Sequence, residues 1–575
     1  MNRHQLVAVF NEIGLLLELA GENPFKSRAY YQAARTLETL KDDPEIIWQE
    51  GRINELPGFG ETLVKKVDEL MRTGELAYLQ RLREETPEGL FELMRVPGLG
   101  PKKVRALYEK LSIQSLEELK AACLEDRLSA LAGFGQKTQD KILEGIHALN
   151  RYQGKYLPVQ VAEEVGALLM EVRKLEGVLR VEVGGSFRRR KEVIKDLDFV
   201  IAVEKSDIDS VLMNLPMIKE VISAGPTKVT LRLRSGILAD FRLVPPTSFA
   251  SAWLHFTGSA EHNTELRRVA KDHGWKLNEY GLFSDEHPLE LSTEADLYKA
   301  LGLSFIPPEL REGSGEVETA SKAELPQLIQ GKDLLGVLHC HTLASDGRAS
   351  LEEMANACKE MGFQYLGIGD HSRSARYARG LEIDRLLGEM QRIDQLNGEY
   401  SDFKILKGVE CDILPDGSLD YPDEILEQLD YVVASVHSNF QMEQEAMTQR
   451  IIKAMQHPRV NIIGHPTGRI LLNREGYAVD MERVIEAAVL TGTALEFNAH
   501  PYRYDLDWRW CRRAVAQGVK LAINPDAHSI EEIPLVYSGV EVIRKGWVEP
   551  KDVINTWDCN SLQQWFDGKS QRMRN

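Results

Sequence analysis

The sequence lacks any apolar run long enough to cross a bilayer, and its N-terminus lacks the charged-then-apolar pattern of a signal peptide. We therefore expect a cytoplasmic protein. Cysteine is scarce, because only six are scattered along the chain and no Cys-x-x-Cys pair occurs, which favours reduced, buried thiols over disulfides or zinc–thiolate sites. Positive charge is also in deficit. A net charge of −18 argues against indiscriminate coating of nucleic acid but allows local basic surfaces.

Three similar glycine turns lie between helical stretches in the first part of the chain. Leu-Pro-Gly-Phe-Gly, Val-Pro-Gly-Leu-Gly and Leu-Ala-Gly-Phe-Gly each precede a helical stretch that carries lysine. Gly-x-Gly lets the backbone approach a ligand closely and directs helix N-terminal N–H groups at an anion. One such turn could be an ordinary connection, but three indicate helix-hairpin-helix motifs that grip DNA phosphates without recognising sequence. The DNA-binding glycines expected on this basis are Gly58, Gly60, Gly98, Gly100, Gly133 and Gly135.

A second signal is the stretch from Gly184 to Val200. A Gly-Gly-Ser turn and three arginines precede Asp196 and Asp198, and the strand period of two places both carboxylates on one face. The apolar run from 238 to 244 supplies a third carboxylate, Asp240. A solvated turn with a charged strand end is the alternative. Three carboxylates on two strands, with a turn that offers N–H groups to phosphate, instead favour a two-metal site for phosphoryl transfer.

Beyond residue 333 short apolar runs alternate with helical stretches, which predicts a parallel sheet of seven strands and hence a (β/α) barrel. Nearly every run ends in a metal-capable residue, at the strand ends where barrel chemistry occurs. A single such histidine would more often belong to the core. Imidazoles and carboxylates without thiolates suit Zn²⁺, Mn²⁺ or Fe²⁺. The candidates are His339, His341, Asp346, His371, Glu410, His437, His465, Asp526 and His528.

The 184–200 stretch with Asp240 resembles the nucleotidyltransferase palm of family X DNA polymerases. The segment from His255 to Arg267 resembles the nucleotide-contacting turn and helix of the same family, although His255 replaces a tyrosine of the animal enzymes and Ala260 replaces an acid. The resemblance implies that Asp196 and Asp198 hold two Mg²⁺ or Mn²⁺ ions, and that Asp240 completes one site and helps to deprotonate the primer 3′-OH. It assigns nucleotide binding to Gly185, Ser186, Arg189, Phe256, Gly258, Asn263 and Arg267.

The C-terminal half resembles the polymerase-and-histidinol-phosphatase (PHP) phosphoesterases. This implies up to three metal ions, with the first held by His339, His341, Glu410 and Asp526. Glu410 would bridge to a second ion with His437 and His465, and Asp346, His371 and His528 would hold the third. Arg373, Arg376 and Arg379 are candidates for holding the substrate backbone, with a solvated charged loop as the alternative.

The N-terminal segment resembles the small lyase domain of animal family X repair enzymes. Lys66 stands where those enzymes use a Schiff-base lysine, with Lys26 and Tyr30 at supporting positions, while Thr62 replaces a basic residue. A lysine on a DNA-facing helix is more often a phosphate contact than a nucleophile, so both interpretations of Lys66 stay open.

Together these resemblances imply a multidomain α+β and α/β protein with the domain order of bacterial family X DNA polymerases. We expect a helical helix-hairpin-helix N-terminal region, a nucleotidyltransferase palm with a thumb or nucleotide-binding subdomain, and a distorted (β/α)7 barrel. The expected ranges are 1–85 for a lyase-like DNA-binding domain, 86–150 for a helix-hairpin-helix region, 151–245 for the palm, 246–313 for the nucleotide-selecting subdomain, 314–332 for a linker and 333–575 for the PHP domain.

The function expected from this order is gap filling in DNA repair, combined with a metal-dependent 3′-5′ exonuclease that processes 3′ ends and could also incise abasic sites. The expected partners are gapped or primer-template DNA and deoxynucleoside triphosphates, for a monomer in the bacterial cytoplasm at the nucleoid. Three alternatives stay open: a nuclease with a feeble palm, a DNA-binding scaffold without catalysis, and a phosphatase acting on small molecules.

Overall fold

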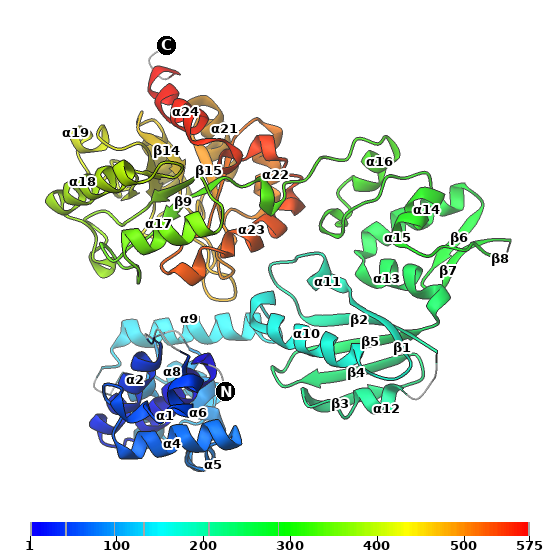
Figure 1. Ribbon diagram of the computed structural model, residues 1–575, viewed down its shortest axis with the longest axis horizontal. Helices are drawn as coiled ribbons and strands as arrows, with labels where there is room; N and C mark the ends of the chain where they lie inside the picture. The colour runs from blue at the N-terminus through cyan, green and yellow to red at the C-terminus, as the bar shows by residue number, and fades with distance from the viewer. Residues whose placement is uncertain are drawn as a thin grey trace. The chain divides into compact units, whose positions relative to one another are not determined.

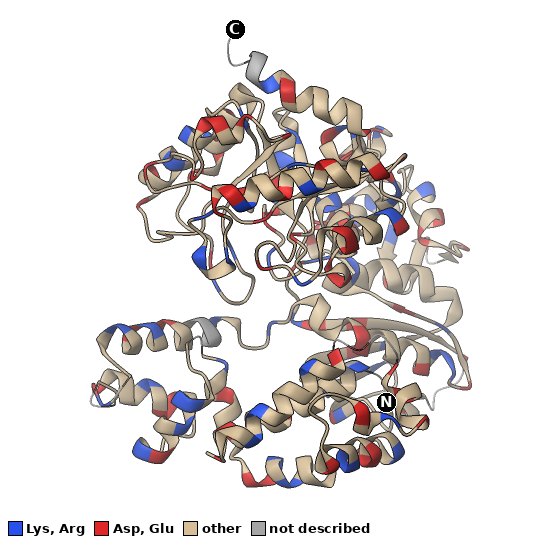
Figure 2. Ribbon diagram, turned by 60° about the vertical axis from the view of Figure 1, so that its left-hand side comes forward, with Lys and Arg blue, Asp and Glu red and all other residues tan. Residues whose placement is uncertain are grey.

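The computed structural model describes the chain except for residues 1–2, 39, 41–42, 97, 130, 132, 205–207, 286 and 573–575. Its contacts divide the chain into two compact units, Met1–Gln153 and Gly154–Asn575. Basic and acidic residues are interspersed along the ribbon of both units (Figure 2). None of the described helices is long and apolar enough to span a bilayer. All six cysteines are free thiols, as their spacing predicted.

The first unit consists of helices packed on two apolar clusters (Figure 1). Phe10 and Val67 are buried in the first cluster, and Leu107 and Phe134 in the second. The helices are α1 (Arg3–Leu19), α2 (Pro24–Glu38), α3 (Pro44–Gln49), α4 (Glu61–Thr73), α5 (Ala77–Glu85), α6 (Glu88–Met94), α7 (Pro101–Leu111), α8 (Leu116–Leu124) and α9 (Gln136–Tyr152).

The second unit begins with a five-stranded sheet in the order β1-β2-β5-β4-β3, covered by α10 (Pro158–Arg173). Strands β2 and β5 are parallel and the other neighbours are antiparallel. Phe199 and Phe241 stack in its core with ring centroids 4.9 Å apart. The elements are β1 (Val178–Val183), α11 (Gly185–Arg188), β2 (Asp196–Val203), α12 (Ile208–Leu212), β3 (Ile218–Ala224), β4 (Lys228–Leu233) and β5 (Leu238–Val244).

A smaller helical subdomain follows, with a core of its own around Leu254, Leu266 and Tyr298. Its short antiparallel sheet, β6-β7-β8, packs beside the helices α13 and α14. The elements are α13 (Phe249–Thr257), α14 (Ala260–Asp272), β6 (Trp275–Asn278), β7 (Gly281–Ser284), β8 (His287–Pro288), α15 (Glu294–Ala300) and α16 (Glu316–Ser321).

Helix α16 lies in the segment 314–332, for which the sequence predicted a linker. Val317 and Ala320 join the apolar core of the subdomain, so this part of the segment is packed structure. Glu316 is fully buried, and its Oε1 lies 2.8 Å from Nδ1 of His262. The backbone N–H groups of Gly313 and Ser314 also donate to this carboxylate. Buried partners of this kind are invisible in a polar, aperiodic sequence.

The C-terminal part is a parallel barrel whose helices surround the strands (Figure 1). Two sheets, β11-β10-β9 and β12-β13-β14-β15-β16, are joined by the bridges Cys340–Ala527 and His371–Glu410. The strands are β9 (Gly336–Cys340), β10 (Tyr365–Ile368), β11 (Lys404–Leu406), β12 (Glu410–Asp412), β13 (Val432–Ser435), β14 (Val460–Ile463), β15 (Ala494–Asn498) and β16 (Leu521–Asn524). The helices are α17 (Leu351–Glu360), α18 (Ile383–Glu399), α19 (Asp423–Leu426), α20 (Gln444–Met455), α21 (Met481–Thr491), α22 (Trp508–Ala516), α23 (Leu535–Ile543) and α24 (Cys559–Arg572).

The single strand expected to end at Glu410 is divided into β11 and β12. Gly408 lies between them, and a Cβ there would meet the ring of Tyr431 at 2.3 Å. The Tyr431 hydroxyl donates to the carbonyl oxygens of Leu338 and Ile368, both at 2.8 Å, inside the barrel. A buried tyrosine thus fills the point where the strand is interrupted, which is a distortion of the regular barrel.

Helix α24 covers the end of the barrel where the strands begin. Phe566 stacks on Tyr431, which directly precedes β13, with centroids 5.2 Å apart. Lys569 is fully buried and donates to Met455 O at 3.1 Å and to Thr493 Oγ1 at 2.6 Å. The candidate metal ligands lie away from α24, at the opposite end of the barrel, where the strands finish.

Candidate active sites in the palm and the PHP barrel

Three carboxylates lie on neighbouring strands of the palm sheet. β2 and β5 run in parallel, and their register places Asp198 opposite Asp240. Because side chains alternate along a strand, Leu197 is buried in the core while Asp196 and Asp198 share the other face. The structure therefore brings the three predicted carboxylates to one side of the sheet.

These carboxylates repel one another. Burial and the negative charges of Asp196 and Asp240 raise the pKa of Asp198 to about 7, although nearby arginines oppose the shift. Asp240 is better compensated, because it accepts a hydrogen bond from Thr230 Oγ1 at 2.6 Å and pairs with Lys228 Nζ at 2.7 Å. A cluster of this charge and oxygen content fits divalent cations, which stabilise the ionised carboxylates.

The glycine turn 184–185 packs directly against Asp198. The N–H of Gly184 donates to Asp198 O at 2.6 Å. Gly185 has φ +58°, and a Cβ at this residue would lie 2.0 Å from Asp198 Oδ2. Only glycine fits this place, so the turn with Ser186 in α11 is held directly beside Asp198.

The arginines that follow this turn have different roles. Arg188 pairs with both carboxylate oxygens of Glu294, at 2.8 and 2.6 Å, and its guanidinium lies 3.4 Å from the Trp253 ring centroid. It therefore ties the palm to the neighbouring subdomain. Arg189 donates to the Thr257 carbonyl, and its Nε lies 3.1 Å from Glu312 Oε1. Arg189 therefore reaches the turn at which α13 ends.

The remaining predicted nucleotide contacts lie at this turn and along α14. A Cβ on Gly258 would be 3.0 Å from Arg189 Nη1. The guanidinium group of Arg242 lies over the Phe256 ring, 4.6 Å from its centroid. Asn263 Nδ2 donates to His255 O at 2.8 Å. Arg267 is exposed and lines a small depression together with His255 and Asn263. Gly258 is thus placed beside Arg189, whereas Asn263 and Arg267 share a separate depression.

A lysine of the barrel that belongs to no sequence motif holds the palm turn. Lys545 is buried, and its Nζ donates to Arg189 O at 3.0 Å and to Glu312 Oε1 at 2.7 Å. Burial opposes ionisation of Glu312, but the charges of Lys545, Arg189 and Lys191 outweigh it and lower its pKa to about 2. Arg469 adds a second tie, with Nη2 3.3 Å from Glu192 Oε1. The loop that carries Arg189 therefore rests on the barrel.

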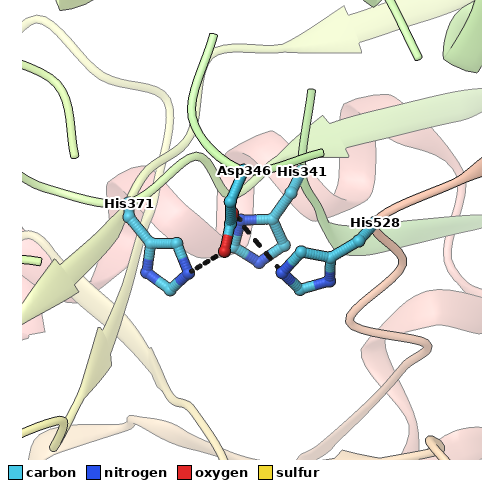
Figure 3. Close-up of side chains that lie close together, drawn as sticks. All are labelled: His341, Asp346, His371 and His528. Atoms are coloured by element: carbon cyan, nitrogen blue, oxygen red, sulfur yellow. Dashed lines mark ion pairs between the residues drawn. The ribbon is translucent and has the colours of Figure 1, made fainter. Parts of the chain in front are cut away.

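In the barrel, the predicted metal ligands gather at the ends of the strands. Figure 3 shows one group, in which His341, His371 and His528 surround Asp346. The closest nitrogen–oxygen distances from these histidines to Asp346 are 3.7, 3.6 and 3.5 Å. All four side chains could hold one ion.

Glu410 lies at the centre of the other groups. Its Oε1 is 3.0 Å from His465 Nε2 and 3.2 Å from His437 Nε2, and its Oε2 is 2.9 Å from His371 Nδ1. His339, His341 and Asp526 form a further group, with 3.1 Å between His341 Nε2 and Asp526 Oδ1. His341 and His371 each belong to two groups in the structure, whereas the resemblance assigned each of them to one ion.

Two carboxylates behind the histidines were missed by the sequence analysis. Glu496 Oε1 lies 2.7 Å from His339 Nδ1, and Asp412 Oδ1 lies 2.5 Å from His437 Nδ1. Each contact leaves the Nε2 of its histidine facing Glu410, at 3.4 Å for His339 and 3.2 Å for His437. Carboxylates that orient histidines in this way are typical of metal centres. An acidic residue inside a buried strand was the available signal.

The ring nitrogens themselves favour metal binding. Among the described residues, His339 Nε2, His341 Nδ1, His371 Nδ1 and His465 Nδ1 are buried without a partner in hydrogen-bonding geometry, although His371 Nδ1 lies 2.9 Å from Glu410 Oε2. Burial, together with the neighbouring His528 and His371, lowers the pKa of His341 to about 4, so this imidazole is neutral at physiological pH. The carboxylates around the centre instead raise the pKa of His437 to about 10 and that of His528 to about 9, although burial opposes both shifts. Imidazoles with carboxylates and no thiolates fit Zn²⁺, Mn²⁺ or Fe²⁺.

The three glycine turns of the first unit share one geometry. Gly58, Gly98 and Gly133 have φ of 86°, 84° and 88°, and a Cβ on any of them, or on Gly60, Gly100 or Gly135, would not clash with another atom. Gly60, Gly100 and Gly135 directly precede α4, α7 and α9, and none of these glycines offers a side chain to cap its helix. The helix N-termini are therefore open to an anion such as a DNA phosphate.

Lys66 lies on α4 in an unusual environment. Its Nζ is 3.4 Å from the centroid of the Tyr78 ring, and Tyr78 stacks on Tyr30. Burial, with a contribution from Arg81, lowers the pKa of Lys66 to about 8. A larger fraction of the amine is consequently neutral near physiological pH than in an ordinary lysine.

Comparison with known proteins finds four family matches and several relatives. Family models match as a "Helix-hairpin-helix domain" at residues 1–76, a "SAM-like Helix-hairpin-helix tandem" at 90–148, a "DNA polymerase beta thumb" at 252–312 and a "PHP domain" at 338–500. The chain is 40% identical to the "DNA polymerase/3'-5' exonuclease PolX" of Bacillus subtilis (strain 168), over 98% of this chain and 99% of that protein. It is 26% identical to "DNA polymerase lambda" of Arabidopsis thaliana over 54% of this chain and 62% of that one. A "probable phosphatase" of Thermoanaerobacter sp. (strain X514) matches 41% of this chain and 95% of its own length at 28% identity.

The fold and its two centres define a nucleotidyltransferase joined to a PHP-type metallo-phosphoesterase, and helix-hairpin-helix modules precede both in the sequence. The near full-length match, at 40% identity, gives the family as well. This chain belongs to the bacterial family X DNA polymerases that carry a C-terminal PHP domain.

Proposed function

We propose that this chain fills short gaps during DNA repair as a DNA-directed DNA polymerase, and that its PHP domain is a metal-dependent 3′-5′ exonuclease. The observation that carries the proposal is the presence of two separate centres on one chain: three carboxylates on β2 and β5, and a histidine–carboxylate cluster at the end of the barrel where the strands finish. The relative from Bacillus subtilis is named for both activities.

In the palm, Asp196 and Asp198 would hold two Mg²⁺ or Mn²⁺ ions, and Asp240 would complete one site and draw the proton from the primer 3′-OH. When bound, the ions supply positive charge that offsets the developing charge on the triphosphate. Gly185 and Ser186 would offer the turn beside Asp198 to the phosphates. Arg189 would bind the triphosphate by exchanging its contact with Glu312, 3.1 Å away, for phosphate oxygens.

Farther along the palm, Phe256 and Gly258 would pack near the sugar of the nucleotide. Asn263 would lie near the minor-groove edge of the base and Arg267 near the template strand. His255, whose carbonyl oxygen accepts a hydrogen bond from Asn263 at 2.8 Å, would bear on sugar discrimination.

In the barrel, the nine strand-end ligands would hold up to three Zn²⁺, Mn²⁺ or Fe²⁺ ions. When bound, such ions activate water near neutral pH and neutralise the phosphate oxygens. Glu496 and Asp412 would hold His339 and His437 in the tautomer whose Nε2 faces the centre. The same centre is a candidate for 3′-end cleaning and for incision at abasic sites.

The two centres act on one primer terminus, so tethering gives each a high effective concentration of the other's product. The open N-termini of α4, α7 and α9 would bind the phosphates of gapped or primer-template DNA. Deoxynucleoside triphosphates are the proposed co-substrates of a monomer at the nucleoid. Lys66 is proposed as the nucleophile of a lyase step.

The test follows one end-labelled primer on a gapped template with Mn²⁺, with and without nucleotides. We expect Asp198→Ala to abolish extension alone and His341→Ala to abolish 3′ shortening alone. Both losses in both variants would contradict two independent centres. A wild-type protein that shortens the primer but never extends it would leave a nuclease with a polymerase-like palm.

A further inference from the structure

Exposed apolar side chains occur in the segments that follow the barrel strands, close in sequence to the candidate metal ligands. Among the described residues after 333, the exposed large hydrophobic side chains are Leu343, Tyr377, Val489, Leu490, Tyr502 and Ile530. All but the two on α21 lie in loops that follow strand ends. Leu343 and Ile530 stand two residues after His341 and His528, which are ligands in the cluster. We call these loop side chains the apolar rim, and an ion or a free phosphate would not require them.

Tyr377 is the most exposed aromatic residue of this rim. Its side chain is 72% exposed, yet its ring centroid lies 6.1 Å from that of His371 and 6.4 Å from that of His437. The two interplanar angles, 59° and 77°, show that neither imidazole stacks on the tyrosine. One ring surface is thus left for a planar ligand beside the cluster.

The loop under Tyr377 is fixed to the strand that carries Glu410. Ser372 N–H donates to Glu410 O at 3.0 Å, and Ser374 N–H donates to Asp420 Oδ2 at 2.7 Å. Arg373, a candidate for substrate binding, instead pairs with Asp420 at 3.3 Å. The exposed ring therefore stands on a rigid base, so its exposure is a property of the folded site.

Two exposed arginines are close neighbours of Tyr377 in the chain. Arg376 and Arg379 are exposed on either side of Tyr377 in and after the short helix η5 (Arg376–Ala378), and within the described part of the chain neither forms an ion pair with an acidic residue. An aromatic face with uncommitted arginines next to it is the chemistry that binds a base and the phosphates adjoining it.

We propose that Tyr377 forms a nucleobase subsite of the exonuclease, on which the base of the 3′-terminal nucleotide stacks while its phosphodiester lies on the metal-ligand cluster. The inference rests on the proposed exonuclease function. Every base has a π face, so stacking on this ring would accept all four bases and would position the scissile phosphate without recognising sequence.

The test compares two single-stranded oligonucleotides in Mn²⁺ with the full chain. One ends in a normal nucleotide and the other in a tetrahydrofuran nucleotide that has no base. Stacking of one base is worth about 5- to 150-fold in binding. We expect Tyr377→Ala to lose that factor in kcat/KM on the normal end and almost nothing on the baseless end. Tyr377→Phe should keep wild-type rates, as should Tyr280→Ala, which removes an exposed tyrosine of the thumb.

An equilibrium readout separates stacking from turnover. In a His341→Ala background, an oligonucleotide with 2-aminopurine at its 3′ end should be quenched on binding, and additional Tyr377→Ala should remove the quenching while Tyr377→Phe keeps it. If Tyr377→Ala lost the same factor on the normal and on the baseless 3′ end, the subsite would be overturned. A Tyr377→Phe variant as weak as Tyr377→Ala would also overturn it, because the phenol O–H would then be the contact. Absence of shortening by the wild type would overturn the exonuclease proposal itself.

Discussion

Replacing Lys545 by methionine should weaken nucleotide incorporation and leave the exonuclease rate unchanged. The lysine donates to Arg189 O and Glu312 Oε1, and so supports the loop proposed to hold the triphosphate. Methionine keeps the length and most of the volume of the side chain but removes the charge and both hydrogen bonds. The barrel ligands do not contact Lys545, so the second centre serves as an internal control.

The size of the effect follows from Glu312. Its pKa falls from 4.5 to about 2, which corresponds to about 3 kcal/mol of preference for the ionised form. Lys545 is the largest of the cationic contributions, and the charge-assisted hydrogen bond that its ammonium makes to the loop is worth about 1.5 kcal/mol, which Lys545→Met would remove. Because the folded pKa is depressed, this stability is present above pH 4.5 and disappears as the pH falls through 2, so assays near pH 7 detect all of it.

The assay is single-nucleotide gap filling at varied nucleotide concentration. We expect Lys545→Met to raise the nucleotide KM about tenfold, the equivalent of about 1.4 kcal/mol, with exonuclease rates unchanged. Lys569→Met is the matched control, because Lys569 is an equally buried lysine of the same barrel that is bound to Met455 and Thr493 and not to the palm. A double-mutant cycle with Glu312→Gln should show coupling of about 1 kcal/mol or more. An unchanged KM in Lys545→Met would refute the reasoning.

Three further outcomes are expected. Because the pKa of Asp198 is about 7, protons compete with cations for this carboxylate below that pH. The Mn²⁺ concentration needed for extension should therefore rise toward tenfold per pH unit below pH 7. Metal titrations at pH 6.0 and 7.5 measure this, and a pH-independent requirement would contradict it. Because the pKa of Lys66 is about 8, borohydride trapping of DNA that carries a 5′-deoxyribose phosphate should increase from pH 7 to 9 and vanish in Lys66→Ala. Lys65, whose exposed ammonium group pairs with Glu61, provides the control, because trapping should persist in Lys65→Ala. Trapping in Lys66→Ala would exclude Lys66 as the nucleophile. Phe566→Ala should destabilise the barrel by about 3–5 kcal/mol, because it removes the buried ring stacked on Tyr431. The exonuclease activity should therefore be lost at a lower temperature than in the wild type. Loss at the wild-type temperature would show that α24 is dispensable.

Local chemistry made much of this protein predictable. The Gly-Gly-Ser turn before Asp196 and Asp198 is short-range, and its reason, a Cβ that would meet Asp198 Oδ2 at 2.0 Å, lies within the same stretch. The gathering of the candidate barrel ligands could be predicted because parallel strands end on one side, which brings together residues that are far apart in sequence. The family X and PHP assignment follows from these two patterns and is confirmed by the comparisons.

Residues whose partners are distant could not be predicted. Glu496 contacts a histidine 157 residues away, and Lys545 contacts Glu312 and Arg189 at separations of 233 and 356 residues. Neither lies in a motif, because a buried charge is specified by its surroundings and not by its neighbours in sequence. The interruption of the strand before Glu410 depends in the same way on Tyr431, which fills the space beside Gly408.

The contact between Lys545 and the palm turn bears on how such chains can be recombined. A cut or an exchange near residue 330 would leave Glu312 short of a cation in one fragment and a buried lysine without acceptors in the other, and each of these costs free energy. Transplanting a PHP barrel from a relative would succeed only if the lysine and its acceptors were inherited together. The two catalytic halves are therefore coupled through this contact, although each has its own chemistry.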